Sequence, residues 1–160
     1  MRHVISVTVE NKPGVLAHIS SLFAARGYSI DSLAVGETED PNVSRMTIVT
    51  RGDDQIIEQI TKQLRKLIST LKVQDLGDAD FIERDLVLIK VGVASGKRSE
   101  ILEVVDIFRG KIVDVAAKDV VIELSGQENK IQALVDLLRP YGIKEMARTG
   151  SIAMTRGAKS

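Results

Sequence analysis

The stretch VTVENKPGVLAHISSLFAARGYSIDSLAV, residues 7–35, contains the pattern that decides the fold. It opens at the end of an alternating segment in which apolar side chains recur every second residue, as in a strand with one buried face. A Pro-Gly turn follows, and from Val15 the apolar residues recur at helical spacing as far as Gly27, a residue type that commonly follows a helix. The stretch therefore predicts a strand, a tight turn and a helix that ends near Arg26.

The residues after this helix again show the two-residue period of strands and the helical spacing of apolar residues. Segments 28–36 and 44–52 are typical of two strands joined by a polar connection. Segment 53–71 returns to helical spacing, and 72–77 is a further short strand. The order βαββαβ is the ferredoxin-like arrangement, in which two helices cover one face of an antiparallel sheet. The predicted apolar stripe of the second helix consists of Ile56, Ile57, Ile60, Leu64, Leu67, Ile68 and Leu71.

The second half of the chain follows the same order. We therefore predict an α+β protein with two ferredoxin-like βαββαβ domains, residues 1–78 and 79–160. The predicted strands of the second domain are 86–93, 111–117, 119–126 and 143–149, and its two helical stripes are Ile101, Val104, Val105 and Phe108, then Ile131, Leu134, Val135 and Leu138.

Composition indicates a globular protein and excludes several partners. Hydrophobic residues make up 44% of the chain and charged residues 28%, which suits a protein that buries a core. Lys plus Arg and Asp plus Glu number 22 each, so no excess positive charge is available for nucleic acid. No apolar run reaches the roughly 20 residues of a membrane-spanning helix, and cysteine is absent, which fits a reducing compartment. We expect a cytoplasmic protein with neither nucleic-acid nor membrane partners.

The sequence contains no constellation of residues for catalysis. Its two histidines, His3 and His18, have no carboxylates at metal-ligand spacing and are interpreted as structural or solvated. The serines lack the G-x-S-x-G context of a nucleophile, and the glycines form neither a phosphate-binding loop nor a dinucleotide fingerprint. We therefore predict no catalytic residue, metal site or cofactor on this chain.

The turn ENKPGVLA, residues 10–17, is the strongest candidate for ligand binding. It directs the unpaired backbone N–H groups of a helix amino terminus into a loop, where they attract an anion. Gly14 permits close backbone approach, and the side-chain amide of Asn11 can donate to a ligand or cap the helix. A small carboxylate fits this turn better than a nucleotide. From the pattern alone, an ordinary strand-turn-helix junction is an equal alternative.

The stretch VTVENKPGVLAHISSLFAARGYSIDSLAVGETEDPNVSRMTIVTRGDD, residues 7–54, resembles the amino-terminal ACT domain of an acetohydroxyacid synthase (acetolactate synthase) regulatory subunit. The segments ERDLVLIKV, IFRGKIVDV and ARTGSIAMTRG resemble the remainder of that small subunit. An N-x-x-G-x-L turn alone would indicate only a generic ACT domain, but together with RGYSIDSLAV and SRMTIVTRGD it is more specific. The resemblance spans nearly the whole chain.

The resemblance implies a homodimer that binds a separate acetolactate synthase catalytic subunit. It implies that this dimer raises the activity of the catalytic subunit and confers feedback inhibition by valine, or another branched-chain amino acid, at the start of valine, leucine and isoleucine synthesis. Thiamine diphosphate, Mg²⁺ and FAD are expected on the catalytic partner and not on this chain.

In that family the effector amino acid is held where two ACT domains meet. The turn and helix start of one protomer would receive its carboxylate, and the second-strand segment of the other would contact it. At Ser29 the family often has asparagine, so the side chain here is shorter. The matching residues are Asn11, Gly14, Val15 and Leu16 at the turn and helix start, and Ser29, Ile30, Ala34 and Val35 in the second-strand segment.

Two other functions compete with this interpretation. A free-standing ACT-type amino-acid sensor acting on another partner would share the first domain, but the family-like C-terminal segments disfavour it. An autonomous enzyme is disfavoured by the missing acid-base, nucleophile and cofactor patterns.

Overall fold

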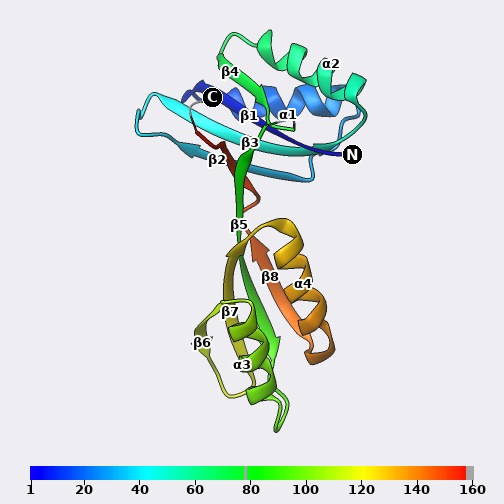
Figure 1. The fold of residues 1–160 in the computed structure, drawn as a ribbon. Coiled ribbons are helices and arrows are strands. Elements are labelled where there is room, and N and C mark those ends of the chain that lie inside the picture. The colour runs from blue at the N-terminus through cyan, green and yellow to red at the C-terminus, as the bar shows by residue number, and fades with distance from the viewer. Residues whose placement is uncertain (78, 158–160) are drawn as a thin grey trace. The chain divides into compact units, whose positions relative to one another are not determined.

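The structure, a computed structural model, describes residues 1–77 and 79–157, and Figure 1 shows its elements. The chain divides into two compact units, each treated by itself below. The first is Met1–Ile82 together with the C-terminal segment from Ser151, and the second is Glu83–Gly150. The predicted division follows residue 78, which lies outside the described residues. It differs from the observed one chiefly in assigning the C-terminal segment to the second domain.

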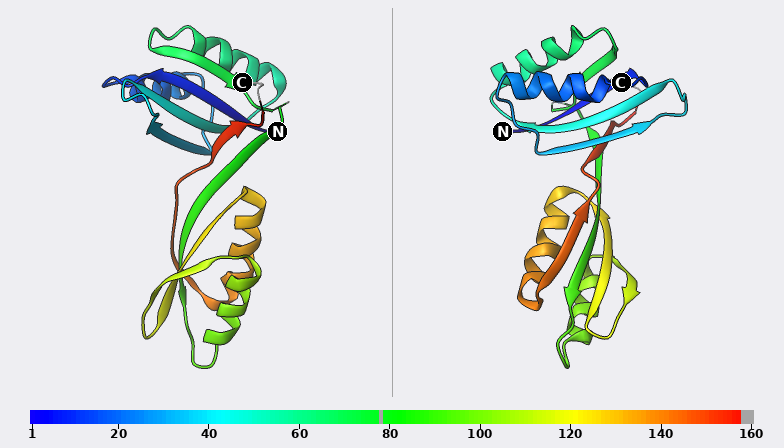
Figure 2. Two further views of the ribbon diagram at one scale, coloured as in Figure 1. Left: turned by 60° about the vertical axis from the view of Figure 1, so that its left-hand side comes forward. Right: turned by 180° about the vertical axis from the view of Figure 1, so that it is seen from behind.

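The first unit has the predicted order βαββαβ, which confirms the ferredoxin-like fold. Its antiparallel sheet has the strand order β2-β3-β1-β4, and both helices lie on one face of it (Figure 2). The elements are β1 (Arg2–Glu10), α1 (Val15–Ala25), β2 (Ser32–Glu37), β3 (Val43–Arg51), α2 (Asp54–Arg65) and β4 (Thr70–Asp75).

The apolar stripes of the strands and helices meet in an aliphatic core. Alternate residues of β1 point toward the helices and are fully buried, as the two-residue period predicts. Each large aliphatic side chain removed from water in this way stabilises the fold by about 1.5–3 kcal/mol. The core includes Ile5, Val7 and Val9 of β1, Val15, Ile19, Leu22 and Phe23 of α1, and Ile57, Ile60 and Leu64 of α2.

The second predicted helix is too long. Tight turns between residues 64 and 70 replace the helical hydrogen bonds, so α2 ends at Arg65. Strand β4 then begins at Thr70, where pairing with β1 overrides the helical pattern. Ile68 and Leu71 are consequently exposed, and the prediction that they lie on the buried stripe was wrong.

The opposite face of the first sheet is partly covered by a strand that the sequence pattern did not predict. This strand, β9 (Ile152–Thr155), pairs with β5 (Phe81–Gly92), whose first two residues belong to this unit. Ala153 packs against Val4 and Val49, which face away from the helices. The C-terminal segment therefore completes the first unit.

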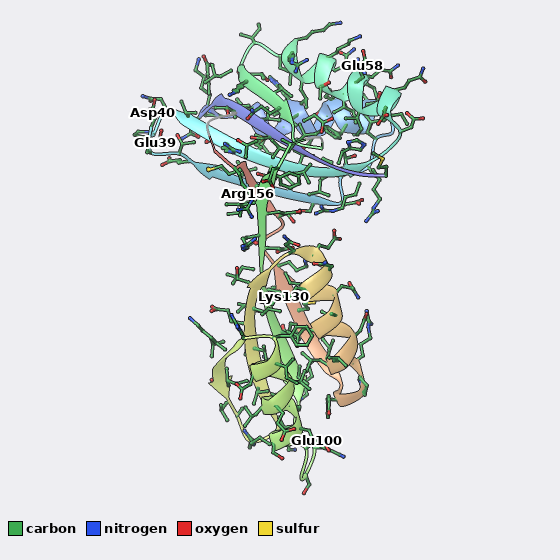
Figure 3. The ribbon with its side chains drawn as sticks, viewed as in Figure 1. Glu39, Asp40, Glu58, Glu100, Lys130 and Arg156 are labelled. Atoms are coloured by element: carbon green, nitrogen blue, oxygen red, sulfur yellow. The ribbon has the colours of Figure 1, made fainter. Side chains whose placement is uncertain are left out.

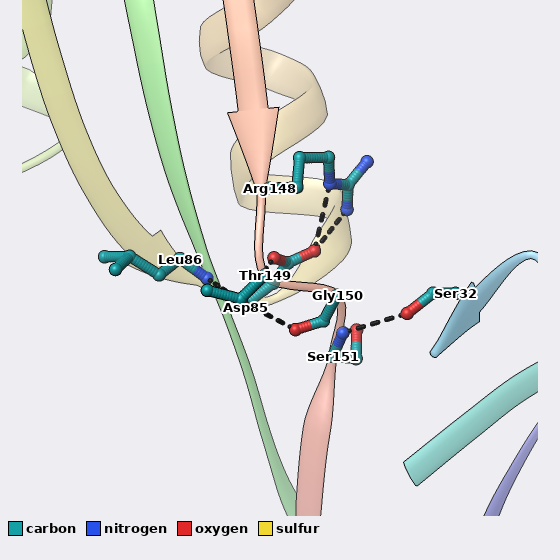
Figure 4. Close-up of polar contacts among 7 residues, drawn as sticks. All are labelled: Ser32, Asp85, Leu86, Arg148, Thr149, Gly150 and Ser151. Carbon is teal, nitrogen blue, oxygen red and sulfur yellow. Dashed lines mark hydrogen bonds and ion pairs between the residues drawn. The ribbon is translucent and has the colours of Figure 1, made fainter. Parts of the chain in front are cut away.

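Polar contacts also attach this segment to the first sheet. The Arg45 guanidinium donates to the carbonyl oxygen of Ala153 at 2.7 Å. The Ser151 N–H donates to the hydroxyl oxygen of Ser32 at 3.0 Å, as Figure 4 shows. Both contacts satisfy groups that would otherwise lie unpaired at the edge of a buried surface.

The second unit repeats the fold with sheet order β6-β7-β5-β8 and two helices. Strand β5 begins five residues before the predicted start at Leu86 and supplies the central strand. Among the described helices of both units, none is long and apolar enough to cross a membrane. The further elements are α3 (Arg98–Ile107), β6 (Lys111–Val115), β7 (Asp119–Gly126), α4 (Glu128–Leu138), a short 3-10 helix η1 (Arg139–Tyr141) and β8 (Ile143–Arg148).

A buried ion pair joins β5 to β8 within the second unit. The Asp85 side chain has no exposed surface, and the guanidinium of Arg148 donates to it from Nε and Nη2 (Figure 4). The hydroxyl oxygen of Thr149 lies 3.3 Å from the same carboxylate. A buried charge is tolerated only when it is paired and hydrogen-bonded, so these contacts hold the end of the sheet together.

Candidate functional site

The turn between β1 and α1 has the backbone geometry that its sequence predicts. Strand β1 ends at Glu10, and the Lys12 N–H donates back to the carbonyl oxygen of Glu10 at 3.0 Å. Gly14 has φ +87°, a left-handed conformation that favours glycine, and α1 begins at the next residue. A Cβ atom at Gly14 would meet nothing within 4 Å, so the space beside this residue is open.

The amino terminus of α1 differs from that of α2. Asp53 caps α2 by accepting a hydrogen bond from the Ile56 N–H at 2.9 Å, and Asp54 adds a negative charge in the first turn. Helix α1 begins after Gly14, has no acidic residue in its first turn, and receives no side-chain cap from the described residues. The partial positive charge of this helix end is therefore not neutralised, and it favours an anion.

Asn11 is engaged by the connection between β2 and β3. Its Nδ2 donates to Glu37 Oε1 at 3.1 Å and to the carbonyl oxygen of Pro41 at 2.9 Å, and its backbone N–H donates to the carbonyl oxygen of Asn42 at 2.8 Å. Figure 3 labels Glu39 in the same connection. The amide thus braces the turn instead of capping α1, and its Oδ1 is the atom left to accept from a ligand ammonium group.

The predicted residues of the second-strand segment do not all lie in the strand. Ser29 and Ile30 precede β2, which starts at Ser32. Ser29 is exposed and its carbonyl oxygen accepts a hydrogen bond from the Thr50 hydroxyl at 2.6 Å, whereas Ile30 is half-buried against the core. These two residues therefore belong to the connection that leads into β2.

Ala34 and Val35 lie within β2 on opposite faces of the sheet. Ala34 pairs with Thr47 on the face away from the helices, and Val35 pairs with Met46 on the helix face. Val35 is half-exposed because β2 is the edge strand of its sheet.

Within one chain, the predicted residues form two groups. Asn11, Gly14, Val15 and Leu16 share the β1–α1 turn, and the hydrogen bond from Asn11 to Glu37 brings the far end of β2 beside them. From Glu37 back to Ser32 an extended strand spans ~17 Å. Ser29 and Ile30 lie beyond that distance, so a single chain does not bring them to the turn.

A hollow next to the first turn of α1 was not predicted from the sequence. It has a volume of about 470 Å³ and is lined by Val15 and His18 of α1 and by residues 66–70. Glu37 was also missed, because no motif marks it and its role depends on the pairing of β2 with β3. The hollow depends on where α2 ends, and sequence periodicity placed that end too late.

Comparison with known families matches both parts of the chain. Residues 5–72 match a model described as an AHAS small subunit-like ACT domain, and residues 84–157 match one described as the small subunit of acetolactate synthase. The probable acetolactate synthase small subunit of Archaeoglobus fulgidus is 54% identical over 99% of both chains. The acetolactate synthase small subunit of Aquifex aeolicus is 54% identical over 97% of this chain and 81% of its own length.

A solved structure has the same fold along its whole length. The crystal structure of the acetolactate synthase small subunit from Thermotoga maritima superposes with a TM-score of 0.89. It is 43% identical in sequence, and the match covers 99% of each chain.

Proposed function

The chain belongs to the family of acetolactate synthase small subunits, and we propose that it binds and activates the catalytic subunit and makes it sensitive to feedback inhibition by valine. In this proposal the chain contributes no catalytic residue. Thiamine diphosphate, Mg²⁺ and FAD belong to the catalytic partner, and the complex works in the cytoplasm. The match of residues 84–157 to a small-subunit model favours this function over a free-standing amino-acid sensor.

The uncapped amino terminus of α1 is the observation that supports an effector site at this turn. Its first turn has neither a cap nor an acidic residue within the described chain, and Gly14 leaves the approach open. The carboxylate of valine would accept hydrogen bonds from these backbone N–H groups. Asn11 Oδ1 is available for the ammonium group, and the exposed side chains of Leu16 and Val35 offer aliphatic surface for the branched side chain.

A homodimer accounts for the separation between the two groups of predicted residues. Strand β2 lies at the edge of its sheet, where it can pair with a second copy. Antiparallel β2-to-β2 pairing about a two-fold axis would bring Ser29 and Ile30 of one protomer beside Asn11 of the other. The effector would then lie between two protomers, and each site would draw on both chains.

Activation of the catalytic subunit is the direct test of this function. The purified chain alone is expected to form no acetolactate, and adding it to the catalytic subunit is expected to raise the rate several-fold and to make that rate fall with added valine. The measurement is acetolactate formation during a titration of each component. An unchanged rate in a mixture whose components demonstrably bind would contradict the proposal.

Valine is also expected to strengthen self-association. A ligand that bridges two protomers stabilises the dimer by RT ln(1 + [L]/Kd), which is about 2.7 kcal/mol at a hundred times Kd. A two-fold dimer has two such sites, so the dimer dissociation constant measured by sedimentation should fall about 100-fold for each site that valine occupies at that concentration. Asn11→Ala removes the hydrogen bonds to Glu37 and Pro41 and should reduce this shift. Valine binding without any change in self-association would place the site within one protomer.

A further inference from the structure

The turn from α2 to β4 presents aliphatic side chains to water. Ile68 is 97% exposed and Leu71 is 54% exposed, although their spacing from Leu64 would bury them if α2 continued. Isolated exposed aliphatic residues are common on protein surfaces. Here two such residues lie three positions apart, beside a hollow and among unpaired charges.

Three cationic residues flank these two aliphatic residues along the chain. Arg65 and Lys66 end α2, and Lys72 follows Leu71 in β4. Among the residues that the structure describes, no carboxylate lies within 4.0 Å of any of these three cationic groups. One turn earlier on α2, Lys62 is paired with Glu58 at 3.1 Å, so the absence of pairing is particular to this end of the helix.

The hollow beside this turn is suited to a side chain from a partner. Its volume of about 470 Å³ exceeds what one side chain needs, and Val15 and Leu67 give it apolar walls.

We propose that Arg65, Lys66, Ile68, Leu71 and Lys72, together called the α2–β4 patch, dock onto the catalytic subunit of acetolactate synthase. The partner surface is an apolar socket rimmed by Asp and Glu side chains, because apolar burial would anchor Ile68 and opposite charges would pair with the cations. This inference rests on the proposed function and names the surface through which the chain reaches its partner.

The positive charge of the α2–β4 patch argues against a second copy of the chain as the partner. A two-fold contact between identical patches would place Lys66 and Lys72 against the same cations of the other copy, and such like-charge contact is unfavourable. A membrane offers negative charge and an apolar interior, but it has no side chain to enter the hollow. A different protein with an acidic rim satisfies the aliphatic residues, the cations and the hollow together.

The test uses the full chain and the purified catalytic subunit. Ile68→Asp is expected to raise the dissociation constant of the complex at least about tenfold, as loss of a central apolar anchor does. The exposure of Ile68 predicts an unchanged melting temperature. Ile107→Asp, at a 76% exposed site in α3, is the matched control and is expected to leave the dissociation constant within about twofold of the parent.

Charge is tested separately from the aliphatic contact. Lys66→Glu combined with Lys72→Glu is expected to weaken binding about tenfold and to make it less sensitive to salt. Lys111→Glu combined with Lys118→Glu, at two exposed positions in β6 and in the turn after it, is the control for the same charge change. Equal affinity of the parent, Ile68→Asp and the double variant for the catalytic subunit would overturn the assignment of the α2–β4 patch.

Other outcomes separate this inference from the proposed function. If the parent chain does not bind the catalytic subunit, the proposed function fails and this surface fails with it. If the parent binds and neither Ile68→Asp nor the double variant weakens binding, the proposed function stands and the docking surface is wrong. Ile68-dependent sedimentation with phosphatidylserine vesicles would assign the patch to a membrane. Loss of the homodimer in Ile68→Asp would assign it to a contact between copies.

Discussion

Replacing Arg148 by methionine is expected to destabilise the unit of residues 83–150 by about 3 kcal/mol. Asp85 has no exposed side-chain surface and receives its charge-assisted hydrogen bonds from Arg148, so the substitution leaves a buried carboxylate without its cation. Thr149 lies 3.3 Å from the carboxylate and offsets only part of the loss. Urea unfolding followed by circular dichroism, with hydrogen exchange of peptides from this unit, measures the effect.

A double variant separates the charge from the lost packing. Asp85→Leu combined with Arg148→Met removes both charges and is expected to be more stable than Arg148→Met alone. Lys118→Met, at an exposed position between β6 and β7 of the same unit, is the control for removing a cation and should change stability by less than about 0.5 kcal/mol. If Arg148→Met changes the free energy of unfolding by no more than this control, the buried pair does not hold β5 to β8.

Gly14→Asp is expected to weaken valine inhibition at least about tenfold, because a carboxylate beside the α1 amino terminus would repel the carboxylate of valine and compete for the same N–H groups. The added Cβ meets no atom within 4 Å, so packing is preserved. The positive φ of 87° costs an ordinary residue about 1–2 kcal/mol, which a stably folded unit tolerates. A valine titration of the reconstituted enzyme, beside calorimetric binding to the isolated chain, measures the effect.

Two controls isolate the charge at this site. Gly14→Asn has the same backbone strain without the negative charge and is expected to keep more of the valine response. Gly96→Asp places the same side chain at another open glycine with φ +78°, in the second unit, and should leave inhibition unchanged. A folded Gly14→Asp variant with the parent's valine titration would show that the effector carboxylate binds elsewhere.

The candidate site could be located from sequence because its main feature is local. A strand that ends at Glu10, a Pro-Gly turn and an apolar period that restarts at Val15 require a tight reversal at Gly14, and the positive φ there follows from those few residues. The commitment of Asn11 to Glu37 and Pro41 could not be predicted, since it depends on how the connection between β2 and β3 approaches the turn.

The sequence by itself determined the βαββαβ order of each unit and most residues of both cores, because burial of one face imposes a period of two or 3.6 that can be read locally. Element ends depended on tertiary pairing: α2 stops at Arg65 because β4 must reach β1. Strand β9 depends most strongly on the tertiary structure. The small Ala153 of this strand and Ser151 just before it are buried, whereas the large Ile152 and Met154 are exposed, which reverses the usual pattern. Only close approach to the outer face of the first sheet selects the small residues for burial, and that contact is set by the tertiary structure.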